Sequence, residues 1–197
     1  MIHCLLGILS MSENRKDTKL VVLDRDGVIN QDSDDYIKTE EEWIPIPGSL
    51  EAIARLNHAG YRIIVATNQS GLGRGYFAID ALNAIHHKMQ QELSTLGAQI
   101  EAIFFCPHAP DADCRCRKPL PGLFEDIAER LRIDMVEIPM IGDSFRDIQA
   151  ATTVGASPSL VLTGKGQSAV KEHMDDLTGI PIYKDLSTAV DALLGSE

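Results

Sequence analysis

The sequence predicts an α/β fold, a three-layer doubly wound parallel sheet with helices on both faces. Along the 197 residues, short runs rich in β-branched residues alternate with longer runs whose apolar residues recur every three or four positions. The strand-like runs are continuously apolar, as expected of strands buried on both faces. No internal repeat, low-complexity tract or linker interrupts the alternation. These observations favour a single three-layer domain.

The first half of the chain predicts three strands and two helices. The run KLVVLD is bounded by polar residues, and the next helix places Leu50, Ile53 and Leu56 on one side before it stops at Gly60. A longer helix is closed by Gly97. In chain order, we expect a strand at 19–24, a helix at 48–59, a strand at 61–68, a helix at 79–96 and a strand at 101–106.

The second half continues the same alternation. Its first helix follows Pro119 and Pro121, which suit the start of a helix, and its second ends before Gly155. In chain order, we expect a helix at 121–131, a strand at 138–143, a helix at 147–154, a strand at 159–163, a possible sixth strand at 180–186 and a helix at 187–194.

Composition and charge narrow the class of protein. Hydrophobic residues make up 44% and charged residues 24%, which is ordinary for a globular domain. The net charge of -11 argues against nucleic-acid or anionic-membrane partners. No apolar run approaches the roughly 20 residues that span a bilayer, and no secretion signal is evident. We expect a cytoplasmic monomer whose partner is a small molecule.

The domain boundary is predicted at the first strand. Residues 1–18 are expected to be a flexible extension, and 19–197 a single domain. A polar stretch, SENRKDTK, follows Met11 directly, so we expect translation to start at Met11. The intact mass of the natively expressed protein would test that start.

Polar residues follow four of the predicted strands. They are Asp24 and Asp26, the segment 67–71, Lys118, and Asp143. An Asp-Gly pair is by itself a common turn, so DRDG alone does not identify a site. However, the carboxyl ends of parallel strands meet at one edge of a sheet, where ligands bind. Loops 31–47, 69–78 and 107–120 should gather over that edge.

These residue types suit phosphoryl transfer. Mg²⁺ held by Asp24 and Asp143 would offset the repulsion between a carboxylate and a phosphate dianion. Lys118 and Thr67 would stabilise the phosphoryl oxygens. Asp24 could then attack and form an aspartyl-phosphate, while Asp26 protonates the leaving alkoxide and later deprotonates water.

A second cluster has the composition of a structural zinc site. Cys106, His108, Cys114 and Cys116 offer three thiols and one imidazole, a full tetrahedral set with no open position. Without a secretion signal, such spacing favours a metal over a disulfide framework. A bound Zn²⁺ would order a loop that continues into Arg117 and Lys118.

The segments DRDGVIN and TNQSG, the RKP lysine and GDSxxD resemble, in that order, the four motifs of the haloacid-dehalogenase (HAD) superfamily of phosphatases. The resemblance implies a Mg²⁺-dependent enzyme, and the narrower resemblance described next implies one without a large cap domain. It also implies that Asp24 is the nucleophile and Asp26 the acid and base. Mg²⁺ would be held by Asp24, the backbone carbonyl of Asp26, and Asp143.

Within this superfamily, TNQSGxGRG, CPHxP and CxCRKPxPG resemble the heptose bisphosphate phosphatases. Those enzymes remove the 7-phosphate of a heptose 1,7-bisphosphate during synthesis of activated heptose for lipopolysaccharide core or related glycans. The resemblance implies that Arg117 helps to select the substrate. The other implied substrate contacts are Asp32, Asp35, Tyr36, Asn68, Gln69 and Ser70.

One departure and two alternatives accompany this interpretation. Position 144 is Ser, where several members of the family carry a lysine, which weakens the expectation of a basic contact there. Histidinol-phosphate phosphatases share the fold, both metals and nearly all the motifs. A non-catalytic, zinc-bearing binding module would share the scaffold, but it would have no physical need to keep Asp24, Asp26 and Asp143 together.

Overall fold

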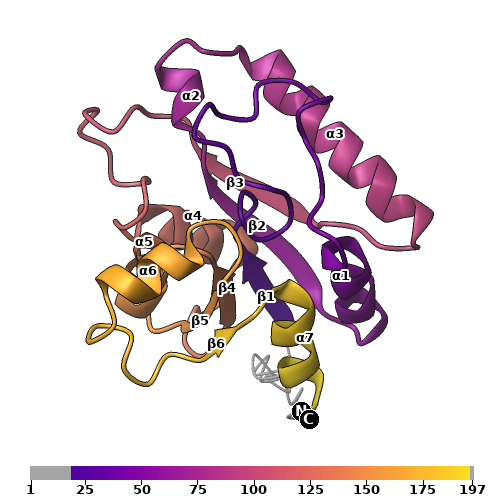
Figure 1. The fold of residues 1–197 in the computed structure, drawn as a ribbon, viewed down its shortest axis with the longest axis vertical. Coiled ribbons are helices and arrows are strands. Elements are labelled where there is room, and N and C mark those ends of the chain that lie inside the picture. The colour runs from indigo at the N-terminus through magenta and orange to yellow at the C-terminus, as the bar shows by residue number, and fades with distance from the viewer. Residues whose placement is uncertain (1–18, 196–197) are drawn as a thin grey trace, which may run out of the picture.

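The structure is a computed structural model that describes residues 19–195. The expected extension at 1–18 and the expected start at Met11 lie outside these residues. Six parallel strands form one sheet in the order β3-β2-β1-β4-β5-β6 (Figure 1). The strands are β1 (Leu20–Leu23), β2 (Arg62–Asn68), β3 (Ala102–Cys106), β4 (Pro139–Gly142), β5 (Ser157–Val161) and β6 (Ile182–Tyr183).

The helices cover both faces of the sheet. They are α1 (Ser49–His58), α2 (Ser70–Gly73), α3 (Ile79–Thr95), α4 (Gly122–Leu131), α5 (Phe145–Thr153), α6 (Gly166–Glu172) and α7 (Leu186–Gly195). Successive side chains of β1 alternate between the faces, as the pleat requires. Val21 and Leu23 belong to the core formed with α1, α3 and α7. Leu20 and Val22 belong to the core formed with α4 and α5.

The fold class predicted from sequence is confirmed, and every expected strand and helix is present. The possible sixth strand is reduced to Ile182–Tyr183, and helices α2 and α6 were not expected. These two helices are short and bury few side chains, so they produce little apolar periodicity. No helix among residues 19–195 is long and apolar enough to cross a membrane.

The strand order places a switch point beside β1. Strand β1 pairs with β2 on one side and with β4 on the other, so the direction of the crossovers reverses between β1 and β4. The amide of Asp24 donates to the Ile141 carbonyl at 2.9 Å and extends this pairing to the strand ends. In open α/β sheets, ligands bind outside the carboxyl ends of the strands at such a point.

Candidate active site

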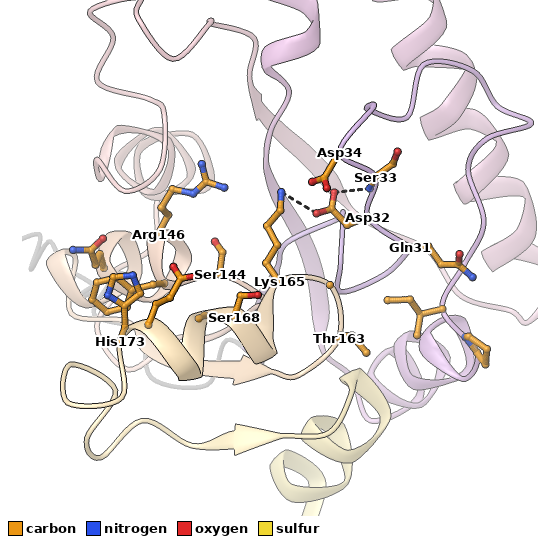
Figure 2. A pocket seen from close by; sticks show the side chains of 17 residues that line it. Gln31, Asp32, Ser33, Asp34, Ser144, Arg146, Thr163, Lys165, Ser168 and His173 are labelled. Carbon is orange, nitrogen blue, oxygen red and sulfur yellow. Dashed lines mark hydrogen bonds and ion pairs between the residues drawn. The ribbon is translucent and has the colours of Figure 1, made fainter.

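Two adjoining depressions lie over the carboxyl edge of the sheet. The outer depression, about 1100 Å³, extends toward Phe145 and His173, whose rings stack at 4.0 Å (Figure 2). The inner cleft, about 340 Å³, contains the residues that follow β1, β2 and β4. Both depressions share a boundary formed by Asp32, Ser33, Asp34, Ser144, Arg146 and Lys165. Residues from all three loops that were expected to gather at this edge line the inner cleft.

Asp24 follows β1 and lies at the base of the inner cleft. The residue is 8% exposed, and its carboxylate accepts the Arg25 amide at 2.7 Å and lies 3.2 Å from the Lys118 ammonium. Burial is the main reason why the pKa of Asp24 is raised to about 7. The charge of Lys118 lowers this pKa, whereas the charges of Asp147 and Asp26 raise it further. A further positive charge would be needed to keep Asp24 fully ionised at neutral pH.

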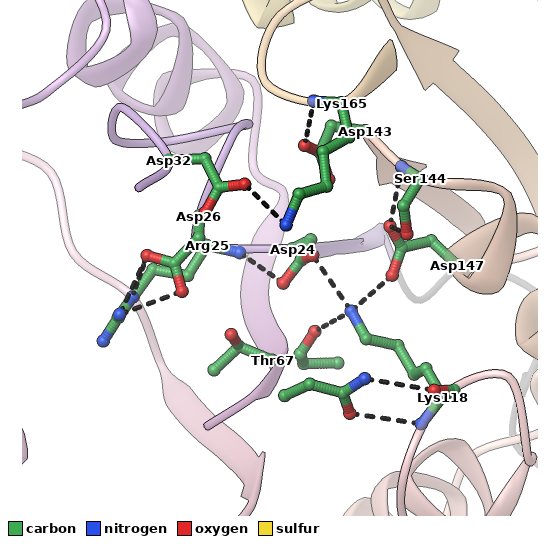
Figure 3. A network of polar contacts seen from close by, with 12 residues as sticks. Asp24, Arg25, Asp26, Asp32, Thr67, Lys118, Asp143, Ser144, Asp147 and Lys165 are labelled. Carbon is green, nitrogen blue, oxygen red and sulfur yellow. Dashed lines mark hydrogen bonds and ion pairs between the residues drawn. The ribbon is translucent and has the colours of Figure 1, made fainter. Parts of the chain in front are cut away.

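Lys118 is a buried cation between two carboxylates (Figure 3). Its ammonium donates to the Ala66 carbonyl at 2.8 Å and pairs with Asp147 at 2.5 Å as well as with Asp24. Burial opposes its charge, but Asp147 and Asp24 outweigh burial and raise the pKa of Lys118. Lys118 is therefore positively charged and fixed beside Asp24.

Asp147 braces this arrangement from the first turn of α5. One of its oxygens pairs with Lys118, and the other accepts the amide and hydroxyl of Ser144 at 3.0 and 2.7 Å. Ser144 and Asp147 thus form a capping box at the start of α5. Asp147 could bind a metal ion through water or support Lys118, and this geometry favours support of Lys118.

Asp143 follows β4 and completes a group of three carboxylates. Oxygens of Asp24, Asp143 and Asp147 lie within 4.8 Å of one another. Burial and the charges of Asp147 and Asp24 raise the pKa of Asp143 well above its ordinary value. Because buried like charges resist joint ionisation, this donor set fits a hard divalent cation such as Mg²⁺.

The backbone approaches Asp143 closely at Gly27. Gly27 has φ +81°, and a Cβ added there would lie 2.0 Å from Asp143 Oδ2. The Lys165 amide donates to the same oxygen at 2.8 Å. Two loops, one after β1 and one after β5, therefore hold the Asp143 carboxylate in place.

The carboxylate of Asp26 points away from the other acids and toward Arg25 (Figure 3). Arg25 is fully buried and donates to both Asp26 oxygens at 2.8 and 2.9 Å. Asn30 and Gln69 donate at 2.9 and 2.8 Å. Burial opposes ionisation, but Arg25 and these hydrogen bonds outweigh it and hold the pKa of Asp26 below its ordinary value.

The residues predicted after β2 have separate local partners. Thr67 is buried at the cleft wall and accepts the Gln69 side-chain amide at 3.0 Å. The Asn68 amide makes two hydrogen bonds with the Lys118 backbone, each 3.1 Å long. Ser70 also lines the cleft. Gln69 and Asn68 therefore orient Asp26 and Lys118, while their predicted contact with substrate stays a prediction.

The loop after β1 forms one wall of the cleft. Asp32 pairs with the Lys165 ammonium at 3.0 Å, and Tyr36 lines the cleft with φ 67°. Asp35, a predicted substrate contact, is exposed and lies outside the cleft lining; its amide donates to the Ser33 hydroxyl at 3.2 Å. Ser33 and Asp34 line the cleft instead, because the turn directs Asp35 outward.

The structure gathers the four residues of the predicted zinc cluster. Cys106 Sγ lies 3.2 Å from Cys116 Sγ and 3.8 Å from Cys114 Sγ, and His108 Nδ1 lies 3.2 Å from Cys116 Sγ. The three cysteines are free thiols. Zn–S bonds of about 2.3 Å in a tetrahedron place the sulfurs roughly 3.8 Å apart, so this donor set fits Zn²⁺.

Comparison with known proteins agrees with this geometry. The model of the haloacid dehalogenase-like hydrolase family matches residues 9–155, about three quarters of the chain. This chain belongs to that family. The strand-end aspartates and Lys118 lie within the matched region. Magnesium and phosphate are present in one solved relative.

The chain is similar to several named relatives. It is 49% identical over 180 residues to D-glycero-beta-D-manno-heptose-1,7-bisphosphate 7-phosphatase of Bordetella bronchiseptica, covering 89% of this chain and 98% of the relative. The protein of that name from Pseudomonas aeruginosa is 48% identical over 175 residues, covering 89% and 97%. The B. bronchiseptica phosphatase with magnesium and phosphate superposes with a TM-score of 0.87, at 48% identity and covering 91% and 99%.

Sequence reasoning missed several residues that line the cleft or contact the acids in it. Arg25 is a buried cation, and its position between two aspartates in the sequence could have indicated its role. Asn30 also donates a hydrogen bond to Asp26. Lys165 comes from the loop after β5, and Arg146 from the start of α5. Lys165 belongs to none of the strand-end motifs, and Arg146 occupies an unspecified position of GDSxxD, so only the tertiary contacts reveal them. Arg74, from the loop after β2, also lines the cleft.

Proposed function

We propose that this chain is a Mg²⁺-dependent phosphatase that removes the 7-phosphate of D-glycero-D-manno-heptose 1,7-bisphosphate. The main support is that Asp24, Lys118 and Asp143 line one cleft, in a chain that is 49% identical to a relative of that name. The product would feed synthesis of nucleotide-activated heptose for lipopolysaccharide core or related glycans. A doubly phosphorylated metabolite of this kind suits the cytoplasmic location expected from the sequence.

In the first step, an Asp24 oxygen attacks the 7-phosphorus. The bond from phosphorus to the sugar oxygen breaks, and an aspartyl-phosphate forms. Lys118, fixed beside Asp24, and the Thr67 hydroxyl lie where they stabilise the phosphoryl oxygens. Asp26, in the protonated form that the second step regenerates, gives its proton to the leaving sugar oxygen, which departs as an alcohol.

In the second step, water attacks the aspartyl-phosphate, and Asp26 accepts the proton of that water. The phosphorus–oxygen bond to Asp24 breaks, which releases inorganic phosphate and restores the carboxylate. The bonds from Arg25, Asn30 and Gln69 favour the ionised form of Asp26, the form that acts as the base. Asp26 thus supplies the proton of the first step and recovers one in the second.

Two metals complete the proposal. Asp24, Asp143 and the backbone carbonyl of Asp26 would hold Mg²⁺, whose charge would favour ionised Asp24 and offset its repulsion from phosphate. Zn²⁺ would be held by Cys106, His108, Cys114 and Cys116 and would fix the loop that carries Arg117 and Lys118.

A substrate panel tests the assignment. Phosphate release is measured with heptose 1,7-bisphosphate, histidinol phosphate and an aryl phosphate, each with and without Mg²⁺. We expect Mg²⁺-dependent preference for the heptose bisphosphate. Preference for histidinol phosphate would favour the phosphatase of histidine synthesis. No release from any substrate by folded, metal-loaded protein would favour a binding module.

The nucleophile is tested by Asp24→Asn. The amide preserves shape but cannot attack phosphorus, so turnover should be abolished while the circular dichroism spectrum is retained. Trapping of a phosphorylated protein in the parent and its absence in the variant would support the aspartyl-phosphate. Retained turnover in the variant would refute the role of Asp24.

A further inference from the structure

Most cations of the inner cleft have a partner within the chain. Lys118 pairs with Asp24 and Asp147, and Lys165 pairs with Asp32. Arg74 is hydrogen-bonded to Tyr76. By contrast, neither Arg117 nor Arg146 has an ion pair or a side-chain hydrogen bond within residues 19–195. The cleft therefore contains two guanidinium groups without a counter-ion from the described chain.

Both arginines line the inner cleft. The Nη1 atom of Arg117 is buried and lacks a hydrogen-bond partner. Arg146 is near enough to Arg117 for their like charges to repel each other. Two cations lining one cleft, one of them with an unsatisfied donor, are unfavourable when alone, but an anion bound by both would offset their repulsion and accept that donor.

Arg146 offers a positive charge close to position 144, where this chain has a serine in place of a lysine. The Ser144 hydroxyl donates to Asp147 at 2.7 Å, so that side chain is committed to the cap of α5 and carries no charge. Arg146 lies two residues later, is exposed, and borders both the inner cleft and the outer depression. Figure 2 shows Arg146 and Lys165 extending from neighbouring elements beside this boundary.

We propose that Arg146 acts with Arg117 to bind the phosphate group that is not hydrolysed, and that Arg146 thereby determines preference for a bisphosphate. This inference rests on the proposed function. The reacting phosphate lies beside Asp24, and the second phosphate of the same sugar lies at the boundary of the two depressions. A guanidinium offers two parallel donors to a phosphate, so the pair can hold it from both sides.

The test compares the parent protein with Arg146→Ala and Arg146→Lys. The ratio of kcat/KM for heptose 1,7-bisphosphate to that for heptose 7-phosphate is measured with Mg²⁺ present. Loss of charge-assisted hydrogen bonds should lower this ratio about 10- to 100-fold in Arg146→Ala. Arg146→Lys should fall between, because lysine keeps the charge but loses the paired donors.

Arg130→Ala is the matched control. Arg130 is an exposed arginine on α4 that pairs with Asp126 outside the cleft, so its removal changes the net charge equally. The ratio should stay at the parental value. An Arg146→Ala ratio equal to that of this control would overturn the inference while leaving the proposed function intact.

A second measurement does not depend on the identity of the sugar. Hydrolysis of an aryl phosphate is inhibited with fructose 1,6-bisphosphate and, separately, with fructose 6-phosphate. We expect stronger inhibition by the bisphosphate in the parent and loss of that difference in Arg146→Ala. If the parent fails on heptose bisphosphate but shows this pattern, the proposed function fails and the subsite stands. Equal inhibition constants in the parent, or an unchanged difference in the variant, would refute the subsite.

Discussion

Replacing Gly27 with alanine should separate backbone strain from damage to the metal site. Gly27 has φ +81°, a conformation that costs a non-glycine residue about 1–2 kcal/mol of folding free energy. The added Cβ would lie 2.0 Å from Asp143 Oδ2, whereas real Cβ contacts under 3.0 Å essentially do not occur. The Asp143 oxygen must therefore retreat by 3.0 − 2.0 Å, at least 1 Å.

A displacement of this size should be visible in catalysis. Misplacing a catalytic group by 1 Å can cost about 100-fold in rate, so kcat/KM of Gly27→Ala should fall by about that factor. The Mg²⁺ concentration for half-maximal activity should rise, because Asp143 is a proposed ligand. Steady-state kinetics over a Mg²⁺ titration measure both quantities, and urea denaturation measures the stability.

Gly97→Ala is the matched control. Gly97 also has a positive φ, +68°, but no atom lies within 4 Å of its added Cβ. It should lose about 1–2 kcal/mol of stability, or roughly 2–8 °C in Tm, and keep the parental Mg²⁺ requirement. If Gly27→Ala keeps the parental Mg²⁺ requirement as well, the close approach to Asp143 does not constrain the metal site.

Three further predictions concern stability and the support of Lys118. The pKa of Asp24 is raised from 3.8 to about 7, so the folded protein without metal is favoured when this carboxyl is protonated. That stabilisation is fully present below pH 3.8 and is lost as the pH rises through 7. In EDTA, Asp24→Asn should therefore be more stable than the parent above pH 7 and similar near pH 4; urea titrations showing equal stability at both pH values would contradict this. Cys114→Ser should lose bound zinc, measured by elemental analysis, together with several degrees of Tm; a zinc-free variant of parental Tm would count against a structural metal. Asn68→Ala removes two 3.1 Å hydrogen bonds to the Lys118 backbone, so it should lower the free energy of unfolding by about 1–3 kcal/mol and also lower kcat. Urea titration and steady-state kinetics that find both quantities unchanged would contradict this role of Asn68.

Local patterns were sufficient to place the acids. A strand buried on both faces must be continuously apolar, so the first polar residue after it marks the sheet edge. That rule located Asp24 after β1 and Asp143 after β4, and the structure brings their carboxylates together. The spacing of the cysteines and His108 likewise sufficed, because ligands only a few residues apart need little tertiary information to meet.

Side-chain direction could not be predicted in the same way. Asp35 lies outside the cleft although its neighbours Asp34 and Tyr36 line it, because the turn geometry decides which side chains face inward. Asp26 points toward Arg25, which becomes understandable only when Asn30 and Gln69 are seen beside it. These choices depend on contacts between segments far apart in the chain.

The sequence by itself determined the class of fold, the strand ends that carry the acids and the composition of the metal-binding loop. Each follows from hydrophobic period, chemical type and short spacing. Only the tertiary structure decided that Arg146 and Arg117 line the same cleft and that Lys165 pairs with Asp32. These cations lie in or beside the loops and helix ends that follow β3, β4 and β5, and packing of the whole sheet determines where such segments meet. The interaction energies of these cations depend on which charges lie next to them, and only the folded chain brings those charges together.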